Sequence, residues 1–181
     1  MTKKITLAVS GSISAYKAAD LTSQLRKLDY DIHILMTEAA QSFITPLTLQ
    51  VLSKNPVHFD LMAEDKADRI NHIDLAKKTD LFIVAPASAN TIAHLAHGFA
   101  DHIVTAVALA LPPHVPKLVA PAMNTQMYHN PVTQRNIATL EQLGYQEIPP
   151  KSALLACGDV GKGALADLEF IVKTIEERMN A

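Results

Sequence analysis

Short apolar runs alternate with amphipathic segments along the whole chain. The apolar runs show no alternation of polar and apolar positions, which is typical of strands buried on both faces. In the segments between them, apolar residues recur every three or four positions, as in helices packed on a sheet. The strands predicted from this pattern are residues 4–10, 31–37, 80–87, 117–122 and 145–149.

The amphipathic segments predict helices whose ends carry recognisable signals. One helix begins at the capping residue Ser88 and stops near Gly98. Residues 37–53 are expected to be helical in two pieces, because Pro46 interrupts the helix. Residues 151–163 fit neither pattern, and we expect a loop there. The other predicted helices are residues 13–28, 71–78, 101–111, 131–144 and 165–180.

This alternation of strands and helices predicts a parallel sheet covered by helices on both faces. We therefore expect the α/β class, as a doubly wound, three-layer sandwich that is flavodoxin-like or Rossmann-like. No repeat, low-complexity tract or linker interrupts the pattern, and 181 residues are enough for one hydrophobic core. Residues 1–181 are therefore predicted to form a single domain.

Composition and charge exclude several classes of protein. A net charge of -2 gives no electrostatic attraction for nucleic acid or an anionic membrane. The longest apolar stretch, around residues 103–111, is too short to span a bilayer. The single cysteine, Cys157, excludes an internal disulfide framework and favours a reducing, cytoplasmic location.

Small and hydroxyl residues follow four of the predicted strands. They lie in residues 10–12, 36–37, 85–91 and 121–124, at the strand ends where ligands bind in folds of this class. Two of these loops open helices, whose N-terminal N–H groups attract a phosphate. The loops contain no Lys or Arg, and the first departs from the dinucleotide fingerprint because it has one glycine. The pattern therefore favours a mononucleotide held by amides and hydroxyls.

Several of these residues also have a purely structural interpretation, and the sequence leaves both open. Ser12 and Ser88 are suited to helix capping as well as to phosphate binding. Met123 and Met127 are suited to filling an apolar core.

The candidate reactive residues have alternatives as well. His72 fits a surface position near a helix start, and Cys157 fits a small buried apolar side chain. His94, His97 and Asp101 lie close together in the sequence, but their spacing matches no strong metal-binding motif. We therefore predict no metal site.

Five segments together carry a resemblance to a known family. They are "GSISAYKA" at 11–18, "NHIDLA" at 71–76, "APASANT" at 85–91, "PAMNTQMY" at 121–128 and "LACGDVGKGALAD" at 155–167. With these five segments in this order, the chain resembles the flavin-dependent cysteine decarboxylases. The resemblance implies a flavodoxin-like fold, bound FMN, and a homotrimer or dodecamer with FMN near a subunit interface. The FMN-binding residues that it implies are Gly11, Ser12, Ile13, Thr37, Ser88, Ala89, Asn90, Thr91 and Ala122.

The resemblance also implies the reacting groups. His72 would be the catalytic base, Asn124 would hold the substrate carboxylate, and Cys157 would be the proton donor. Ala164 and Leu165 stand where many relatives have Arg and Met. The implied substrate-binding residues are Asn124, Met127, Leu154, Leu155 and Ala156.

The activity implied is decarboxylation of 4'-phospho-N-pantothenoylcysteine to 4'-phosphopantetheine in coenzyme A biosynthesis. Oxidation of the cysteine CH2–SH to a thioaldehyde creates an electron sink, loss of CO2 gives an enethiolate, and reduction gives the saturated thiol. The amide of Asn124 would hold the carboxylate without a positive charge that would oppose its departure. Two alternatives stay open within the resemblance: a peptidyl-cysteine decarboxylase, which keeps the enethiol, and a non-catalytic FMN-binding regulator of a phosphatase.

Overall fold

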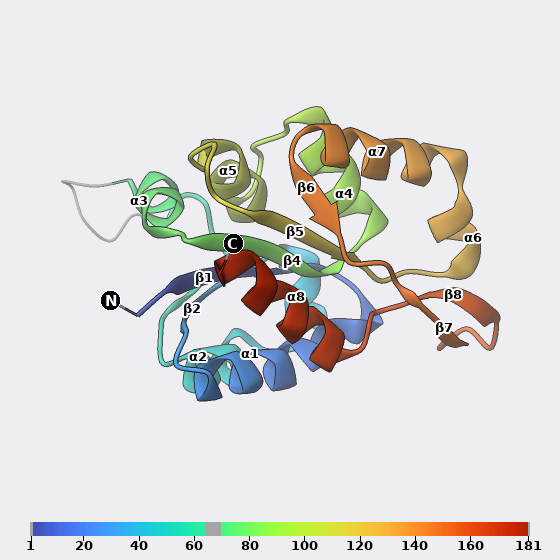
Figure 1. The fold of residues 1–181 in the computed structure, drawn as a ribbon, viewed down its shortest axis with the longest axis horizontal. Helices are drawn as coiled ribbons and strands as arrows, with labels where there is room; N and C mark the ends of the chain where they lie inside the picture. Colours follow the sequence, from blue (N-terminus) through green and yellow to red (C-terminus); the bar gives the residue numbers. More distant parts are fainter. Residues whose placement is uncertain (1, 64–69, 181) are drawn as a thin grey trace.

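A six-stranded parallel sheet forms the centre of the molecule in the computed structural model, which describes residues 2–63 and 70–180. The strand order is β3-β2-β1-β4-β5-β6 (Figure 1). The five longer strands follow the flavodoxin order, and the two-residue β3 at the edge completes the Rossmann order. The strands are β1 (Lys4–Val9), β2 (Asp31–Met36), β3 (Val57–His58), β4 (Leu81–Ala87), β5 (Lys117–Pro121) and β6 (Tyr145–Glu147).

Helices cover both faces of this sheet. On one face α1, α2 and α8 pack on the sheet, and on the other α3, α4, α5 and α7 pack on it. The helices are η1 (Ile13–Tyr16), α1 (Lys17–Lys27), η2 (Glu38–Ser42), α2 (Pro46–Ser53), α3 (Asn71–Lys78), α4 (Ala89–His97), α5 (Ile103–Ala110), α6 (Thr125–His129), α7 (Pro131–Gln142) and α8 (Leu168–Asn180).

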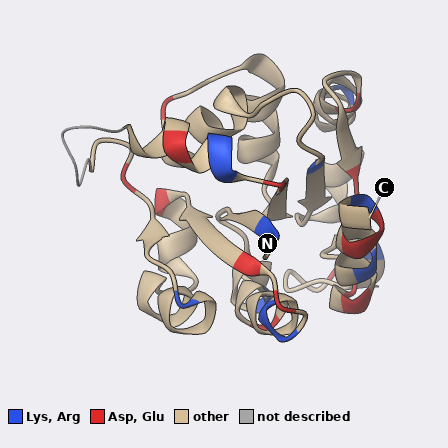
Figure 2. Cartoon of the chain, turned by 60° about the vertical axis from the view of Figure 1, so that its left-hand side comes forward, with Lys and Arg blue, Asp and Glu red and all other residues tan. Residues whose placement is uncertain are grey.

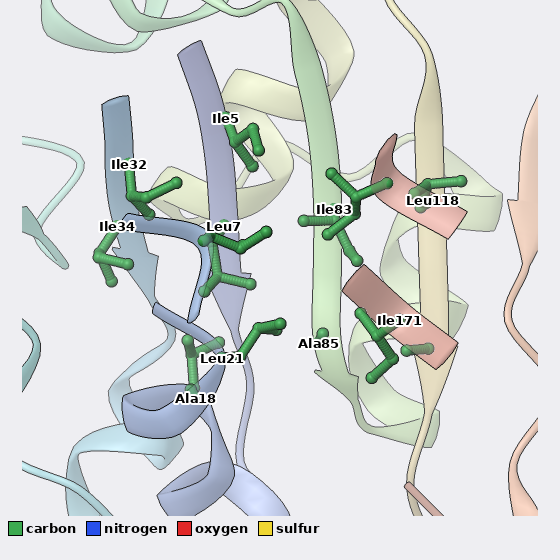
Figure 3. Close-up of a cluster of buried hydrophobic side chains, with 14 of the residues drawn as sticks. Ile5, Leu7, Ala18, Leu21, Ile32, Ile34, Ile83, Ala85, Leu118 and Ile171 are labelled. Carbon is green, nitrogen blue, oxygen red and sulfur yellow. The ribbon is translucent and has the colours of Figure 1, made fainter. Parts of the chain in front are cut away.

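The core lies in two layers because side chains on buried strands alternate between the faces. On β1, Leu7 points to the face of α1 and α8, where it joins Leu21 and Ile171 (Figure 3). Its neighbour Ala8 belongs to the opposite cluster with Phe82. The predicted three-layer α/β sandwich is therefore confirmed, and it directs the ends of β1, β4 and β5 to one edge.

The prediction of a loop over residues 151–163 is wrong. Two antiparallel strands, β7 (Lys151–Leu154) and β8 (Val160–Ala164), form a hairpin there. The hairpin does not show the pattern of buried strands, because it contains three glycines and alternates exposed with half-buried positions. The short helix α6 within the loop that follows β5, and the strand β3, were also not predicted.

Charged residues are spread over the fold rather than gathered in one field. Figure 2 shows acidic and basic positions side by side on the C-terminal helix α8. Among residues 2–63 and 70–180, no helix is long and apolar enough to cross a membrane.

Candidate active site

A cleft of about 630 Å³ lies at the carboxyl edge of the sheet, between the strand-end loops and the hairpin β7-β8. Its walls come from the loops after β1, β4 and β5 and from residues 151, 153–157 and 163–164. The predicted site residues that line it are Gly11, Ser12, Ile13, Ser88, Ala89, Ala122, Asn124, Met127, Leu154, Leu155, Ala156 and Cys157. Segments far apart in the sequence thus meet where the strand-end pattern predicted a ligand.

Hydroxyl groups shape the part of the cleft beside the helix starts. Ser12 accepts a hydrogen bond from the Ser14 N–H at 3.3 Å, as the N-cap of η1. Ser88 accepts one from the Thr91 N–H at 3.2 Å, as the N-cap of α4. Both serines are therefore helix caps, and both line the cleft. The first N–H groups of such short helices lack partners within the helix, so this corner offers donors to an anion.

Gly11 lies in the first loop because no side chain fits there. A Cβ at this position would lie 2.6 Å from the Cβ of Ala39, in the 3-10 helix η2. The loop therefore lies close against the segment after β2.

Three of the predicted FMN-binding residues lie outside the lining of the cleft. Thr37 is buried and caps η2, accepting from the Ala40 N–H at 3.3 Å. Thr91 is buried beneath the start of α4, and Asn90 is exposed on that helix. Thr37 and Thr91 thus support the loops that form the walls.

The side chains of Asn124 and Cys157 meet across the cleft. The Asn124 Oδ1 accepts from the Gln126 N–H at 2.8 Å, which fixes the amide as the N-cap of α6. Its Nδ2 therefore faces the hairpin, 3.3 Å from the Cys157 sulfur and 3.0 Å from Oδ2 of Asp159. Cys157 is exposed, so the interpretation as a buried apolar residue is wrong.

Two glycines allow β8 to lie directly on the loop that carries Asn124. The Met123 N–H donates to the Gly163 carbonyl at 2.9 Å. A Cβ on Gly163 would lie 2.3 Å from the Met123 carbonyl oxygen, and one on Gly161 would lie 2.7 Å from the Thr125 hydroxyl. These clashes explain Gly161 and Gly163, the last two glycines of "GDVGKGA".

Tyr128 supports the contact between β8 and the loop that carries Asn124. Its ring is buried, its hydroxyl donates to Glu147 at 3.0 Å, and the Lys162 ammonium of β8 lies 5.3 Å from its centroid. Burial, and then the Glu147 carboxylate, raise the pKa of Tyr128 to about 12. Tyr128 therefore supports the cleft without lining it.

His72 lies far from Asn124 and Cys157 within one chain. It is the second residue of α3, which Figure 1 shows at the opposite end of the molecule from the hairpin β7-β8. Its Nδ1 is buried and has no hydrogen-bond partner among the described residues. The structure therefore does not bring all three predicted catalytic residues together in a single chain.

Sequence reasoning missed the cations of the cleft. Lys17 and Lys151 both line it, although the strand-end loops themselves contain no Lys or Arg. Lys17 opens α1 one turn beyond the first loop, and Lys151 begins β7, where it pairs with Asp167. The position of Lys17 one helical turn after the glycine-serine loop was the available signal.

The departure from the usual Arg-Met pair affects the cleft and the core differently. Ala164 lines the cleft at the end of β8. Leu165 points away from it and is 1% exposed, packed in the core with α8. The hairpin therefore presents a small apolar side chain to the cleft at this position.

A separate polar cluster joins α4 to α5. The Asp101 Oδ1 lies 3.3 Å from Nδ1 of His94 and 3.9 Å from Nε2 of His102, whereas His97 bonds a carbonyl of its own helix. Nδ1 of His102 caps α5 by accepting from the Thr105 N–H at 3.4 Å. This bond places the proton of the neutral ring on Nε2, on the side of Asp101.

Comparison with known proteins agrees with this architecture. The sequence model of the flavoprotein family matches residues 1–180. The chain is 69% identical to the "Probable phosphopantothenoylcysteine decarboxylase" of Streptococcus mutans serotype c, covering 99% of this chain and 100% of that protein. It is 46% identical to the "Coenzyme A biosynthesis bifunctional protein CoaBC" of Bacillus subtilis, and it spans 43% of that protein's length.

Solved structures agree as well. A cysteine-to-serine mutant of a PPC decarboxylase, complexed with pantothenoylaminoethenethiol, superposes with a TM-score of 0.91 at 31% identity and full coverage of both chains. "The FMN binding protein AtHal3" gives 0.86 at 32% identity, over 98% of this chain and 96% of that one. By sequence and by structure, this chain belongs to the flavoprotein family.

Proposed function

We propose that this protein is an FMN-dependent carboxy-lyase that decarboxylates 4'-phospho-N-pantothenoylcysteine to 4'-phosphopantetheine in coenzyme A biosynthesis. The observation that carries the proposal is the approach of the Asn124 amide to the Cys157 thiol, 3.3 Å across the cleft. A carboxylate ligand and a proton donor thus lie on opposite walls of one site. The 69% identity to a probable phosphopantothenoylcysteine decarboxylase supports the same substrate.

The residues of the cleft fit FMN. Its capped helix starts, hydroxyls and close-packed glycine suit a phosphate, and its volume of about 630 Å³ suits a cofactor together with the end of a substrate. When bound, FMN supplies a reversible hydride acceptor for the carbon that carries the substrate thiol. The residues proposed to hold it are Gly11, Ser12, Ile13, Thr37, Ser88, Ala89, Asn90, Thr91 and Ala122.

Asn124 orients the carboxylate that leaves. The Gln126 N–H fixes the amide oxygen, so Nδ2 faces the cleft, where it donates hydrogen bonds without adding positive charge. A cation would stabilise the carboxylate more than the neutral CO2 that forms from it, and would slow the reaction. Met123 and Met127 supply apolar surface beside this amide, which favours dispersal of the charge.

Cys157 completes the second half of the reaction. Loss of CO2 from the thioaldehyde leaves an enethiolate, whose carbon next to nitrogen needs a proton before the hydride returns. The exposed thiol on the hairpin, held beside Asn124, is placed to give that proton. The oxidation and the reduction cancel, so no second electron carrier is required.

Lys17 and Lys151 are suited to the phosphate charges of the ligands. Both the substrate and FMN carry a phosphate, and these two lysines are cations on the wall of the cleft. Their positive charge attracts anionic ligands to the cleft.

His72 reaches the cleft of a neighbouring subunit in this proposal. It is too far from Cys157 in its own chain, and its buried Nδ1 has no partner among the described residues. A homo-oligomer, a trimer or a dodecamer, brings it to the FMN of another chain as the base that accepts the thiol proton. The working unit is then an assembly of single-domain chains, 1–181, in the cytoplasm.

Two related functions make different use of the same cleft. A peptidyl-cysteine decarboxylase keeps the enethiol and needs no proton donor, so the thiol of Cys157 at the carboxylate site argues against it. A non-catalytic FMN-binding regulator of a phosphatase needs no contact between Asn124 and Cys157, so this contact argues against that function as well.

Incubation of the FMN-loaded protein with 4'-phosphopantothenoylcysteine tests the proposal. Mass spectrometry should find 4'-phosphopantetheine, and released CO2 should equal the substrate consumed. A product two hydrogens lighter identifies the enethiol-forming activity, and unchanged substrate identifies a binding protein.

A further inference from the structure

The carboxylate of Asp159 lies on the amide of Asn124. Its Oδ2 accepts from the Asn124 Nδ2 at 3.0 Å and from the Cys157 thiol at 3.4 Å. The other end of the Asn124 amide is held by the Gln126 N–H at 2.8 Å, so the amide cannot rotate away without losing that bond. One carboxylate oxygen of the protein thus contacts both groups to which the proposed function gives a role.

This arrangement places a carboxylate where the substrate needs to place one. The NH2 group of an asparagine is only a donor, and a carboxylate is the acceptor that it bonds most strongly. Two carboxylates on one NH2 group would repel each other, so binding of one opposes binding of the other.

We infer that Asp159 is a positioning residue that occupies the carboxylate position on Asn124 until substrate binds and displaces it. This inference rests on the proposed function, because it needs a substrate with a carboxylate. Asp159 and Cys157 belong to one tight turn, closed by bonds from the Leu155 N–H to the Asp159 carbonyl at 2.8 Å and from the Gly158 N–H to the Leu155 carbonyl at 2.9 Å. Displacement of Asp159 therefore moves the turn that carries the thiol and releases the thiol from its acceptor.

The exchange also separates substrate from product. When CO2 leaves, Asn124 loses its bound carboxylate, and Asp159 returns to the same amide. The protein then competes against ligands that carry the carboxylate and leaves binding of the decarboxylated product unaffected. Asp159 thus weakens substrate binding in order to reset the site after each turnover.

Steady-state kinetics of the FMN-loaded, full-length protein test the inference. For Asp159→Asn, which removes the charge and keeps the shape, we expect the KM for 4'-phosphopantothenoylcysteine to fall by roughly tenfold, as expected for loss of one competing charge-assisted hydrogen bond. The inhibition constant of 4'-phosphopantetheine, which lacks the carboxylate, should stay unchanged. Glu169→Gln, which removes an exposed charge outside the cleft, is the matched control and should alter neither constant.

Other results overturn the inference. A KM that stays the same or rises in Asp159→Asn excludes competition at Asn124, and a KM that falls together with the inhibition constant shows general loosening of the hairpin. Wild-type protein that releases no CO2 instead refutes the proposed function.

Hydrogen exchange gives a second measurement that needs no turnover. In Asp159→Ala, amide exchange in residues 155–158 should be several-fold faster than in the wild type, because the turn has lost its contact with Asn124. Exchange at the wild-type rate shows that Asp159 does not hold the turn, and overturns the inference independently of any activity.

Discussion

The Met123 N–H donates to the Gly163 carbonyl at 2.9 Å, across 40 positions of the sequence, and this bond fixes the hairpin β7-β8 on the loop that carries Asn124. No side chain separates the two backbones, because a Cβ on residue 163 would lie 2.3 Å from the Met123 oxygen. The position of Cys157 relative to Asn124 therefore depends on a backbone contact that involves the side chain of neither residue. Activity should therefore be sensitive to the glycine of β8 that makes this contact, although it has no side chain to offer substrate or cofactor.

Gly163→Ala should displace β8 from the Met123 loop. Relief of the backbone clash costs about 1–3 kcal/mol of stability when the structure gives way. We expect FMN binding to persist and kcat/KM to fall by at least roughly tenfold, since the proton donor moves by a fraction of an ångström or more. Ser152→Ala, an exposed change on the neighbouring strand β7, is the control. Wild-type kinetics for Gly163→Ala would show that β8 docking is unimportant.

Asn124→Asp should abolish decarboxylation while retaining FMN. A second carboxylate about 4 Å from the substrate's raises the energy of the bound state by about 4 kcal/mol at an effective dielectric constant near 20, which corresponds to a loss of roughly a thousandfold. The cofactor absorbance spectrum and CO2 release measure the two properties separately. Activity within a few-fold of the wild type removes Asn124 from the carboxylate site.

Mixed oligomers test the proposed position of His72. The variants His72→Asn and Cys157→Ser should each fail to form 4'-phosphopantetheine when purified alone. After unfolding, mixing and refolding, some cleft sites would pair an intact Cys157 with an intact His72 from a neighbouring chain, and these sites should be active. No recovery of product in verified mixed oligomers would place the base on the same chain or on another residue.

The strands and helices that build the sheet could be predicted because their pattern is local. Buried runs such as residues 80–87 and caps such as Ser88 identify themselves within one segment. The hairpin β7-β8 could not be predicted this way. Its residues Gly161 and Gly163 are glycines because β8 packs directly on a loop about 40 positions earlier in the sequence. Similarly, the resemblance indicated Asn124 and Cys157, but the place of Asp159 between them depends on the folded turn.

The free energy of unfolding should fall as the pH drops below about 6.5, the ordinary pKa of a histidine, because of His102. Burial, the largest cause, lowers the pKa of His102 in the folded protein; Asp101 raises it and His94 lowers it further. The folded state therefore favours the neutral ring, and its stabilisation is present above pH 6.5 and is lost as the pH falls. Protonation of Nδ1 also removes the cap on α5, because that nitrogen accepts from the Thr105 N–H.

The variant His102→Asn isolates this effect, because asparagine caps a helix without titrating. Urea denaturation at pH 7.5 and pH 5.5 should show a loss of about 1 kcal/mol more for the wild type than for the variant, the typical contribution of an N-cap. Equal losses in the two proteins would show that His102 does not titrate in this range.

Cys157→Ser should separate the two halves of the reaction. A hydroxyl is a much weaker acid than a thiol, so delivery of a proton to the enethiolate should slow sharply, whereas binding and oxidation should continue. In a single anaerobic turnover, the flavin absorbance should bleach, CO2 should be released, and the product should be two hydrogens lighter than 4'-phosphopantetheine. Because the side chain is exposed on the hairpin, the substitution should leave the unfolding midpoint close to that of the wild type. Saturated product formed at the wild-type rate would exclude Cys157 as the proton donor, and the peptidyl-cysteine type of reaction would be excluded by saturated product from the wild type alone.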